Sequence, residues 1–298
     1  MLTDQQWDEY SRDGFVHLGR VVDDGELEML RRRVDDLALG RLRNPDVLFQ
    51  MDTGGSYDDL PAAMGTLDDG TLLYRKVQGL ETDTEFARLI THPAFLDACA
   101  RQYGRHAPLS IFRAMVMNKP AGQGTVLPWH QDGGEVWALD RDPLVTVWVA
   151  LDDALPENGC MEIVPGSHRL GLLSWYGSTV RDEDVARYCT ADRVRSLPVR
   201  AGHAVVVHNW LLHRSGVNPS SRPRRAFTAC LMDARTRNNL TGELFPLVHG
   251  AVAGEPPPYL GHLRAENALL HESRASAEEY ALSLEREREQ LRSTGRIG

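Results

Sequence analysis

From Ser110 onward, short apolar runs rich in β-branched residues alternate with turn-forming Gly, Pro, Asn and Asp. The clearest runs are residues 146–151, Thr-Val-Trp-Val-Ala-Leu, and residues 204–207, Ala-Val-Val-Val. Asn158-Gly159 lies between two such runs and is a strong signal for a tight turn. Runs of this length and composition are typical of strands. Many short strands separated by turns indicate a closed or double-sheet β architecture.

The N-terminal part shows a different pattern, because residues 3–39 predict a helix, a short strand and a second helix. Thr3 is expected to cap the first helix, and residues 14–18, Gly-Phe-Val-His-Leu, form the strand-like segment. Asp23 or Asp24 is expected to cap the second helix. That helix is predicted by apolar residues at helical spacing, namely Leu27, Leu30, Val34 and Leu37.

Two further segments carry little strand or core pattern. Residues 40–71 are rich in Gly, Asp and Pro, which predicts a long loop of the kind that forms lids. Residues 275–291 are rich in Glu and Arg without Gly or Pro, which predicts a terminal surface helix.

Composition narrows the class of protein. A chain of 298 residues with 42% hydrophobic residues can bury a full core. The net charge of −9 argues against a nucleic-acid partner, because such proteins carry a basic surface. No apolar run approaches a membrane span and no signal peptide is visible, so we expect a cytoplasmic protein without membrane contact. The scattered cysteines are expected to be reduced, small buried residues: Cys99, Cys160, Cys189 and Cys230.

One short motif contains candidate metal ligands. His130 and Asp132 are two residues apart, so on a strand, or just after one, both side chains point to the same side. With a second histidine, His213, they can bind iron(II) on one face and leave the opposite face open. His208 lies five residues before His213 and is the main alternative for the second histidine. The pair alone is weak evidence, since long chains contain some by chance.

The sequence around these residues strengthens the interpretation. Seven blocks occur in order, namely Lys76-Val77-Gln78, Asn118-Lys119-Pro120, Trp129-His130-Gln131-Asp132, residues 148–153, residues 157–160, residues 165–168 and residues 211–225. In order and spacing, the chain resembles the phytanoyl-CoA dioxygenase family of iron(II)- and 2-oxoglutarate-dependent oxygenases. The resemblance covers roughly residues 1–235 and leaves the last part of the chain unmatched.

The resemblance implies a mainly β fold, a double-stranded β-helix (a jelly-roll, cupin-like core) with helices packed outside. We expect a single oxygenase domain over residues 1–298. Its parts would be N-terminal helices at about residues 1–100, the jelly-roll core at about 105–235 and a C-terminal extension at about 236–298.

The resemblance also assigns roles to residues. The implied iron ligands, which are also the catalytic residues, are His130, Asp132 and His213. Arg224, eleven residues after the second histidine, would bind the distal carboxylate of 2-oxoglutarate, because a guanidinium fork pairs with a carboxylate through two hydrogen bonds. Arg225 is the alternative, and by strand alternation only one of the two arginines can face inward. The remaining positions implied to line the co-substrate site are Lys76, Met115 and Trp148.

The expected function is therefore iron(II)/2-oxoglutarate-dependent hydroxylation of an unactivated carbon in a small molecule, a secondary metabolite, with dioxygen as oxidant. Related halogenases lack the carboxylate at position 132, so its presence favours oxygenation. Two alternatives remain, which are oxidative ring closure on a sugar-containing natural product, such as orthoester formation, and a non-catalytic jelly-roll binding protein. We expect a monomer or small homo-oligomer. Residues near the motifs that could contact substrate are Trp137, Trp175, Tyr176, Trp210, Glu135 and Arg214.

Overall fold

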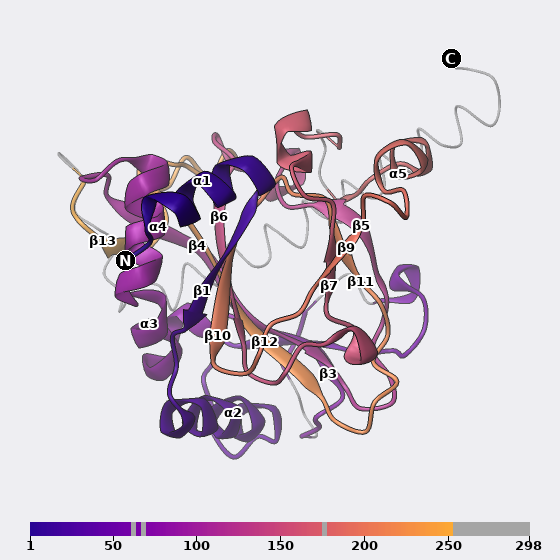
Figure 1. The fold of residues 1–298 in the computed structure, drawn as a ribbon. Helices are drawn as coiled ribbons and strands as arrows, with labels where there is room; N and C mark the ends of the chain where they lie inside the picture. Colours follow the sequence, from indigo (N-terminus) through magenta and orange to yellow (C-terminus); the bar gives the residue numbers. More distant parts are fainter. Residues whose placement is uncertain (61–63, 67–69, 175–177, 253–298) are drawn as a thin grey trace.

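The chain folds around two antiparallel sheets that pack face to face, as the ribbon of the computed structural model shows (Figure 1). The structure describes residues 1–60, 64–66, 70–174 and 178–252. Apolar side chains of both sheets meet between them, since Trp148 and Ala150 share one buried cluster with Met161 and Ile163. This arrangement is the predicted double-stranded β-helix.

The larger sheet has eight strands. In spatial order they are β1 (Phe15–Arg20), β10 (His203–His208), β6 (Val145–Ala150), β12 (Arg224–Asp233), β4 (Leu109–Lys119), β3 (Tyr74–Gln78) and β2 (Leu48–Met51), with β13 (Leu247–His249) added to β4. The smaller sheet is ordered β8 (Ser178–Thr179), β5 (Leu127–Gln131), β11 (His213–Ser215), β7 (Met161–Ile163) and β9 (Arg195–Leu197). Most neighbours in these sheets are far apart in the sequence.

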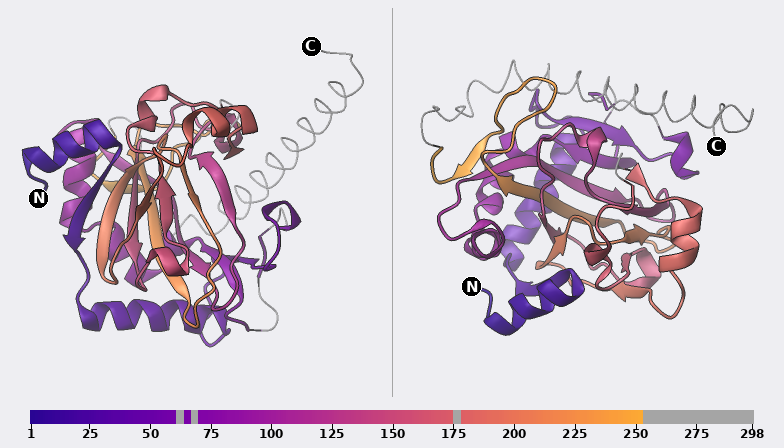
Figure 2. Two further views of the ribbon diagram at one scale, coloured as in Figure 1. Left: turned by 45° about the vertical axis from the view of Figure 1, so that its right-hand side comes forward. Right: turned by 90° about the horizontal axis from the view of Figure 1, so that it is seen from above.

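Helices cover the outer face of the larger sheet and leave its inner face to the second sheet (Figures 1 and 2). They are α1 (Asp4–Asp13), α2 (Asp24–Ala38), α3 (Thr84–Ile90) and α4 (Pro93–Tyr103). Outward strand residues such as Val116, Val147 and Phe227 share the main buried cluster with apolar residues of these helices. A further helix, α5 (Asp182–Tyr188), packs beside the smaller sheet through Val185 and Tyr188.

The inner face of the larger sheet, called here the inner wall, is built in tiers because directly paired residues point the same way. Arg113 of β4 pairs with Cys230 of β12 in the first tier. The second tier joins Gln78, Met115, Thr228 and Trp148, and the third joins Lys76, Met117, Ala226 and Ala150. Lys119 and Arg224 form the fourth. Arg113 therefore lies at one end of this wall and Lys119 with Arg224 at the other, and the two tiers between them contain mainly apolar side chains together with Gln78 and Lys76.

Local predictions for the N-terminal part are confirmed. The side chain of Thr3 caps α1 by accepting a hydrogen bond from the backbone N–H of Gln6, and Asp23 caps α2 by accepting from Glu26. The four predicted apolar positions of α2 are buried: Leu27, Leu30, Val34 and Leu37.

The loop predicted at residues 40–71 was wrong in part, because residues 48–51 form β2 and pair with β3. This strand is too short to produce a pattern, and it is stabilised by its neighbour and by burial of Phe49. The tail at 275–291, Trp175 and Tyr176 lie outside the described residues. No helix in the described part of the chain has the length and apolar character needed to cross a membrane.

Candidate active site

Two histidines face each other across neighbouring strands of the smaller sheet. His130 of β5 pairs directly with His213 of β11, and the centroids of their rings are 3.9 Å apart. Asp132 comes immediately after the last residue of β5. One possible ligand atom from each of these three side chains lies within 4.8 Å of the other two. Among the described residues, they form the single group of His, Cys, Asp and Glu arranged closely enough to hold a metal ion.

The residue between the first two members anchors this turn. Gln131 is buried, and its side-chain amide donates to the carbonyl oxygens of Gly171 and Trp210, at 2.9 and 2.7 Å. Its amide oxygen accepts from the backbone N–H of Leu173 at 2.7 Å. The backbone N–H of Asp132 donates to the carbonyl of Asn209 at 2.8 Å. The bonds to Trp210 and Asn209 join the end of β5 to the segment that leads into β11, and so fix His130 and Asp132 relative to His213.

Both imidazoles are oriented by a hydrogen bond from Nδ1 to a backbone carbonyl oxygen. Nδ1 of His130 lies 2.8 Å from the carbonyl oxygen of Pro128, and Nδ1 of His213 lies 2.8 Å from that of Leu211. A carbonyl only accepts, so each Nδ1 carries the proton and each Nε2 keeps a lone pair for a metal. Burial and the neighbouring ring of His213 lower the pKa of His130 to about 3, which keeps this ring neutral. Two neutral imidazoles and one carboxylate fit iron(II) as a facial donor set.

A second polar site lies in the fourth tier of the inner wall. Arg224 is only 4% exposed, and its Nε has no hydrogen-bond partner among the described residues. Its guanidinium carbon lies 5.8 Å from the centroid of the Trp148 ring. A buried cation without a paired carboxylate is costly unless a ligand supplies the negative charge. This orphaned donor fits a carboxylate such as that of 2-oxoglutarate.

Sequence reasoning missed the partner of this arginine. Lys119 pairs directly with Arg224 across β4 and β12, and it is also 4% exposed. Its ammonium donates to the carbonyl oxygen of Thr125 at 2.8 Å. Burial, followed by the nearby charges of Arg224 and Arg75, lowers the pKa of Lys119 to about 6. A signal was present in the sequence, because Lys119 and Lys76 are the only lysines among 33 basic residues, and both lie on the inner wall.

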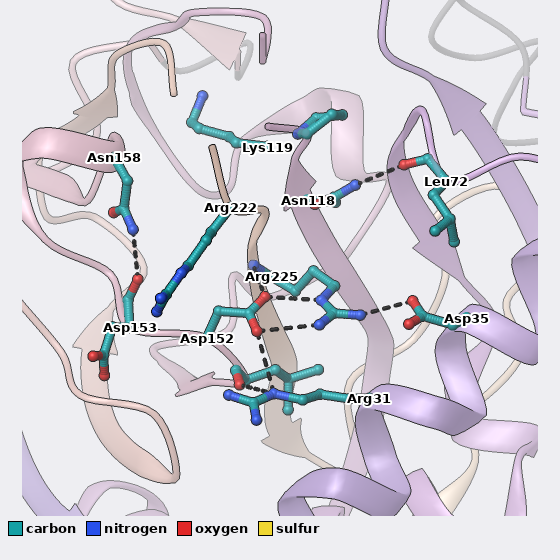
Figure 3. A network of polar contacts seen from close by, with 12 residues as sticks. Arg31, Asp35, Leu72, Asn118, Lys119, Asp152, Asp153, Asn158, Arg222 and Arg225 are labelled. Carbon is teal, nitrogen blue, oxygen red and sulfur yellow. Dashed lines mark hydrogen bonds and ion pairs between the residues drawn. The ribbon is translucent and has the colours of Figure 1, made fainter. Parts of the chain in front are cut away.

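Arg225 points to the opposite face of β12. It donates to both carboxylate oxygens of Asp152 and, at 2.7 Å, to Asp35 of α2, while Arg31 lies 3.2 Å from Asp152 (Figure 3). This network joins a helix to the outer face of the larger sheet. Arg225 is therefore fully engaged in structural ion pairs, which leaves Arg224 as the arginine that faces the interior.

The other residues expected near the co-substrate also lie on the inner wall. Met115 and Trp148 belong to one tier, each paired with Thr228 and each 6% exposed. Lys76 lies one tier closer to Arg224, opposite Met117.

His208, the alternative second histidine, lies outside the metal-binding group. Its ring is 4.9 Å from that of His168 and 6.2 Å from that of Tyr10 of α1. Its Nδ1 accepts a hydrogen bond from the backbone N–H of Trp210. Burial and the nearby His168 lower its pKa to about 4. His208 is thus a packed, neutral histidine on the side of α1.

Sequence reasoning also missed Arg113, in the first tier. Its guanidinium stacks over the ring of Trp137, 4.3 Å from the centroid, and lies 4.0 Å from Asp132. By contrast, Arg214 pairs with Glu162 at 2.8 Å and stacks on Trp129, while Glu135 is exposed.

With this geometry established, comparison with known proteins places the chain. The sequence model of the family "Phytanoyl-CoA dioxygenase (PhyH)" matches residues 10–226, which is well over half of the chain. The chain belongs to this family. It is accordingly an iron(II)- and 2-oxoglutarate-dependent non-heme oxygenase, as its motifs predicted. Iron(II) is the metal cofactor of this class, and 2-oxoglutarate and dioxygen are its co-substrates; the two polar sites fit iron(II) and 2-oxoglutarate.

Similarities to curated relatives and to a solved structure are consistent with this family assignment. The chain is 31% identical to phytanoyl-CoA dioxygenase domain-containing protein 1 of Mus musculus, over 49% of this chain and 53% of that protein. It is 27% identical to L-proline trans-4-hydroxylase of Streptomyces griseoviridis, over 72% of this chain and 81% of that enzyme. The apo structure of the non-heme monooxygenase ThoJ superposes with a TM-score of 0.66 at 22% identity, covering 93% of this chain and 98% of its own. This last similarity shows that the fold is shared.

Proposed function

We propose that the chain hydroxylates an unactivated carbon of a small molecule, a secondary metabolite, with His130, Asp132 and His213 as the iron ligands. The observation that carries this proposal is the complete donor set, because Asp132 lies with both imidazoles at one point. A carboxylate in that position occupies the place that a halide takes in related halogenases. Bound together, iron(II), 2-oxoglutarate and dioxygen supply an oxidant that can remove a hydrogen atom from an unactivated C–H bond.

The protein holds the co-substrate between two fixed points. The metal group on the smaller sheet would hold its 2-oxo acid end, and Arg224 with Lys119 would hold its distal carboxylate. Met115 and Trp148 lie in the second tier and would provide an apolar surface beside the carbon chain of 2-oxoglutarate. Arg224, and Lys119 once the bound carboxylate restores its proton, would compensate the charge of the carboxylate, and the guanidinium fork would add a directional pair of hydrogen bonds.

A non-catalytic binding protein would need neither the metal group nor the buried cationic pair. The test is to add iron(II), 2-oxoglutarate and dioxygen and to measure succinate formed without any further substrate. We expect slow turnover by the wild type and none by Asp132→Ala, with unchanged secondary structure by circular dichroism. Equal succinate formation by Asp132→Ala and wild type would refute the assignment of this metal site.

A further inference from the structure

The first tier of the inner wall carries a cation that neither iron nor 2-oxoglutarate accounts for. Arg113 is six residues from Lys119 on the same strand, so their Cα atoms are about 20 Å apart. The fourth tier already offers Arg224 and Lys119 for the distal carboxylate of the co-substrate. Arg113 lies instead beside the metal group, 4.0 Å from Asp132. A molecule that extends from the metal toward Arg224 therefore extends away from Arg113.

The guanidinium of Arg113 lies against two aromatic rings, and its nearest carboxylate among the described residues is that of Asp132, 4.0 Å away. The guanidinium carbon lies 4.3 Å from the ring centroid of Trp137 and 5.2 Å from that of Phe112, and the two rings stack on each other. The group makes no hydrogen bond with any described residue. Stacking on an aromatic face leaves the edge of the guanidinium, with its N–H groups, free to bind a planar anion. Its side chain is 19% exposed, so a ligand can reach it.

Local backbone distortions support this arrangement. A β-bulge interrupts the pairing of β4 with β12 next to Arg113, since Cys230 pairs with Arg113 but Leu231 pairs with Ile111. Bulges redirect side chains and are common beside active sites. Directly after Trp137, Ala138 has a φ of 52°, the single positive φ of a non-glycine among the described residues. Strain of this kind is concentrated at ligand sites.

Charge balance indicates what binds there. Asp132 is the one carboxylate that the described residues place within 4.0 Å of Arg113. When Asp132 and the 2-oxo acid carboxylate of 2-oxoglutarate both bind a dication, their two negative charges are offset by the metal, and the positive charge of Arg113 is then left without a counter-charge. An anion beside Arg113 would restore the balance. A single guanidinium matches a singly charged, planar carboxylate, to which it donates two parallel hydrogen bonds.

We propose that Arg113, stacked on Trp137, binds a carboxylate group of the organic substrate and so directs the adjoining carbon skeleton toward the metal. The inference rests on the proposed function, because it places substrate on the side of the metal opposite Arg224. It defines the substrate class as small carboxylic acids, amino acids and sugar acids included.

The test measures binding rather than turnover. Protein is saturated with zinc(II) and 2-oxoglutarate, so that Arg224 is occupied and no reaction occurs. Matched acids and amides are then titrated by ligand-observed NMR: benzoate and benzamide, L-proline and L-prolinamide, glucuronate and glucuronamide. We expect at least one acid to bind tenfold or more tightly than its amide. Arg113→Gln should remove that difference and Arg113→Lys should reduce it. The control Arg105→Gln, at an exposed turn before β4, should preserve it.

Several outcomes would overturn the inference. Acids that never bind more tightly than their amides would do so, and so would an acid preference that survives in Arg113→Gln. Weaker zinc binding in Arg113→Gln, with acid preference intact, would show that Arg113 only positions Asp132. Wild-type protein that fails to bind zinc and 2-oxoglutarate together would refute the proposed function itself, and the inference would fall with it. The metal and co-substrate titrations thus separate the two failures.

Discussion

Replacing Lys119 by Met should stabilise the ligand-free protein and weaken its binding of 2-oxoglutarate. Burial lowers the pKa of this lysine from 10.5 to about 6. Relative to its neutral form, the charged lysine is therefore on the order of 6 kcal/mol less stable in the folded chain than in the unfolded chain. At pH 7.5 the unfolded lysine is charged and the folded one is largely neutral, so folding releases a proton at a cost of roughly 4 kcal/mol. Methionine removes this cost but leaves the carbonyl of Thr125 unpaired. The unpaired carbonyl destabilises the folded protein by about 2 kcal/mol, so the net effect of the substitution is still stabilising.

The sign of the pH dependence follows from the same numbers. Between pH 6 and 10.5 the unfolded wild type binds more protons than the folded one, so its stability rises with pH. Lys119→Met lacks this titration, so its advantage should be largest near pH 6 and shrink by roughly 4 kcal/mol by pH 9. Urea denaturation at both pH values measures this difference. An advantage that is the same at pH 6 and pH 9 would refute the reasoning.

Binding of 2-oxoglutarate provides the second half of this test. The incoming carboxylate should restore the charged form of Lys119, so the wild type should take up close to one proton per ligand at pH 7.5. Calorimetry in two buffers of different ionisation enthalpy measures this uptake. Lys119→Met should take up fewer protons and bind about tenfold more weakly, the equivalent of one lost charged contact. Lys76→Met, which removes the only other lysine, should cause a smaller loss of affinity.

Three further predictions concern the metal, the two arginines and the product. His213→Ala should abolish metal-dependent succinate formation while His208→Ala retains it, and the reverse result would exchange their roles. Arg224→Ala should raise the apparent KM for 2-oxoglutarate by about thirtyfold or more, the equivalent of 2–5 kcal/mol for a buried charged contact, whereas Arg225→Ala should lower the free energy of unfolding by about 3–5 kcal/mol by leaving Asp152 without this partner. A large increase in the KM for 2-oxoglutarate in Arg225→Ala, without one in Arg224→Ala, would show that Arg225 and not Arg224 faces the interior. With labelled dioxygen, mass spectrometry should show one labelled oxygen in the product, and a product two hydrogens lighter without label would instead establish ring closure.

Several features could be predicted from the sequence because they depend on neighbours along the chain. Thr3 and Asp23 cap their helices through bonds to residues three positions away. The strand at Val145–Ala150 follows from its β-branched composition. The spacing of His130 and Asp132 suffices to put both side chains on one side of the end of a strand. The order and spacing of the sequence blocks carried the family resemblance, and the resemblance implied the fold.

The tertiary structure decided which of several equivalent residues face the interior. Arg224 and Arg225 are adjacent and chemically identical, and only the pairing of β12 with β4 and β6 determines which one lies beside Lys119. The approach of Arg113 to Asp132 likewise depends on a bulge in β4 and on the packing of the two sheets, which join residues far apart in the sequence. Side-chain direction alternates at every residue of a strand, so a single step in register exchanges inside and outside. Only long-range strand pairing sets that register.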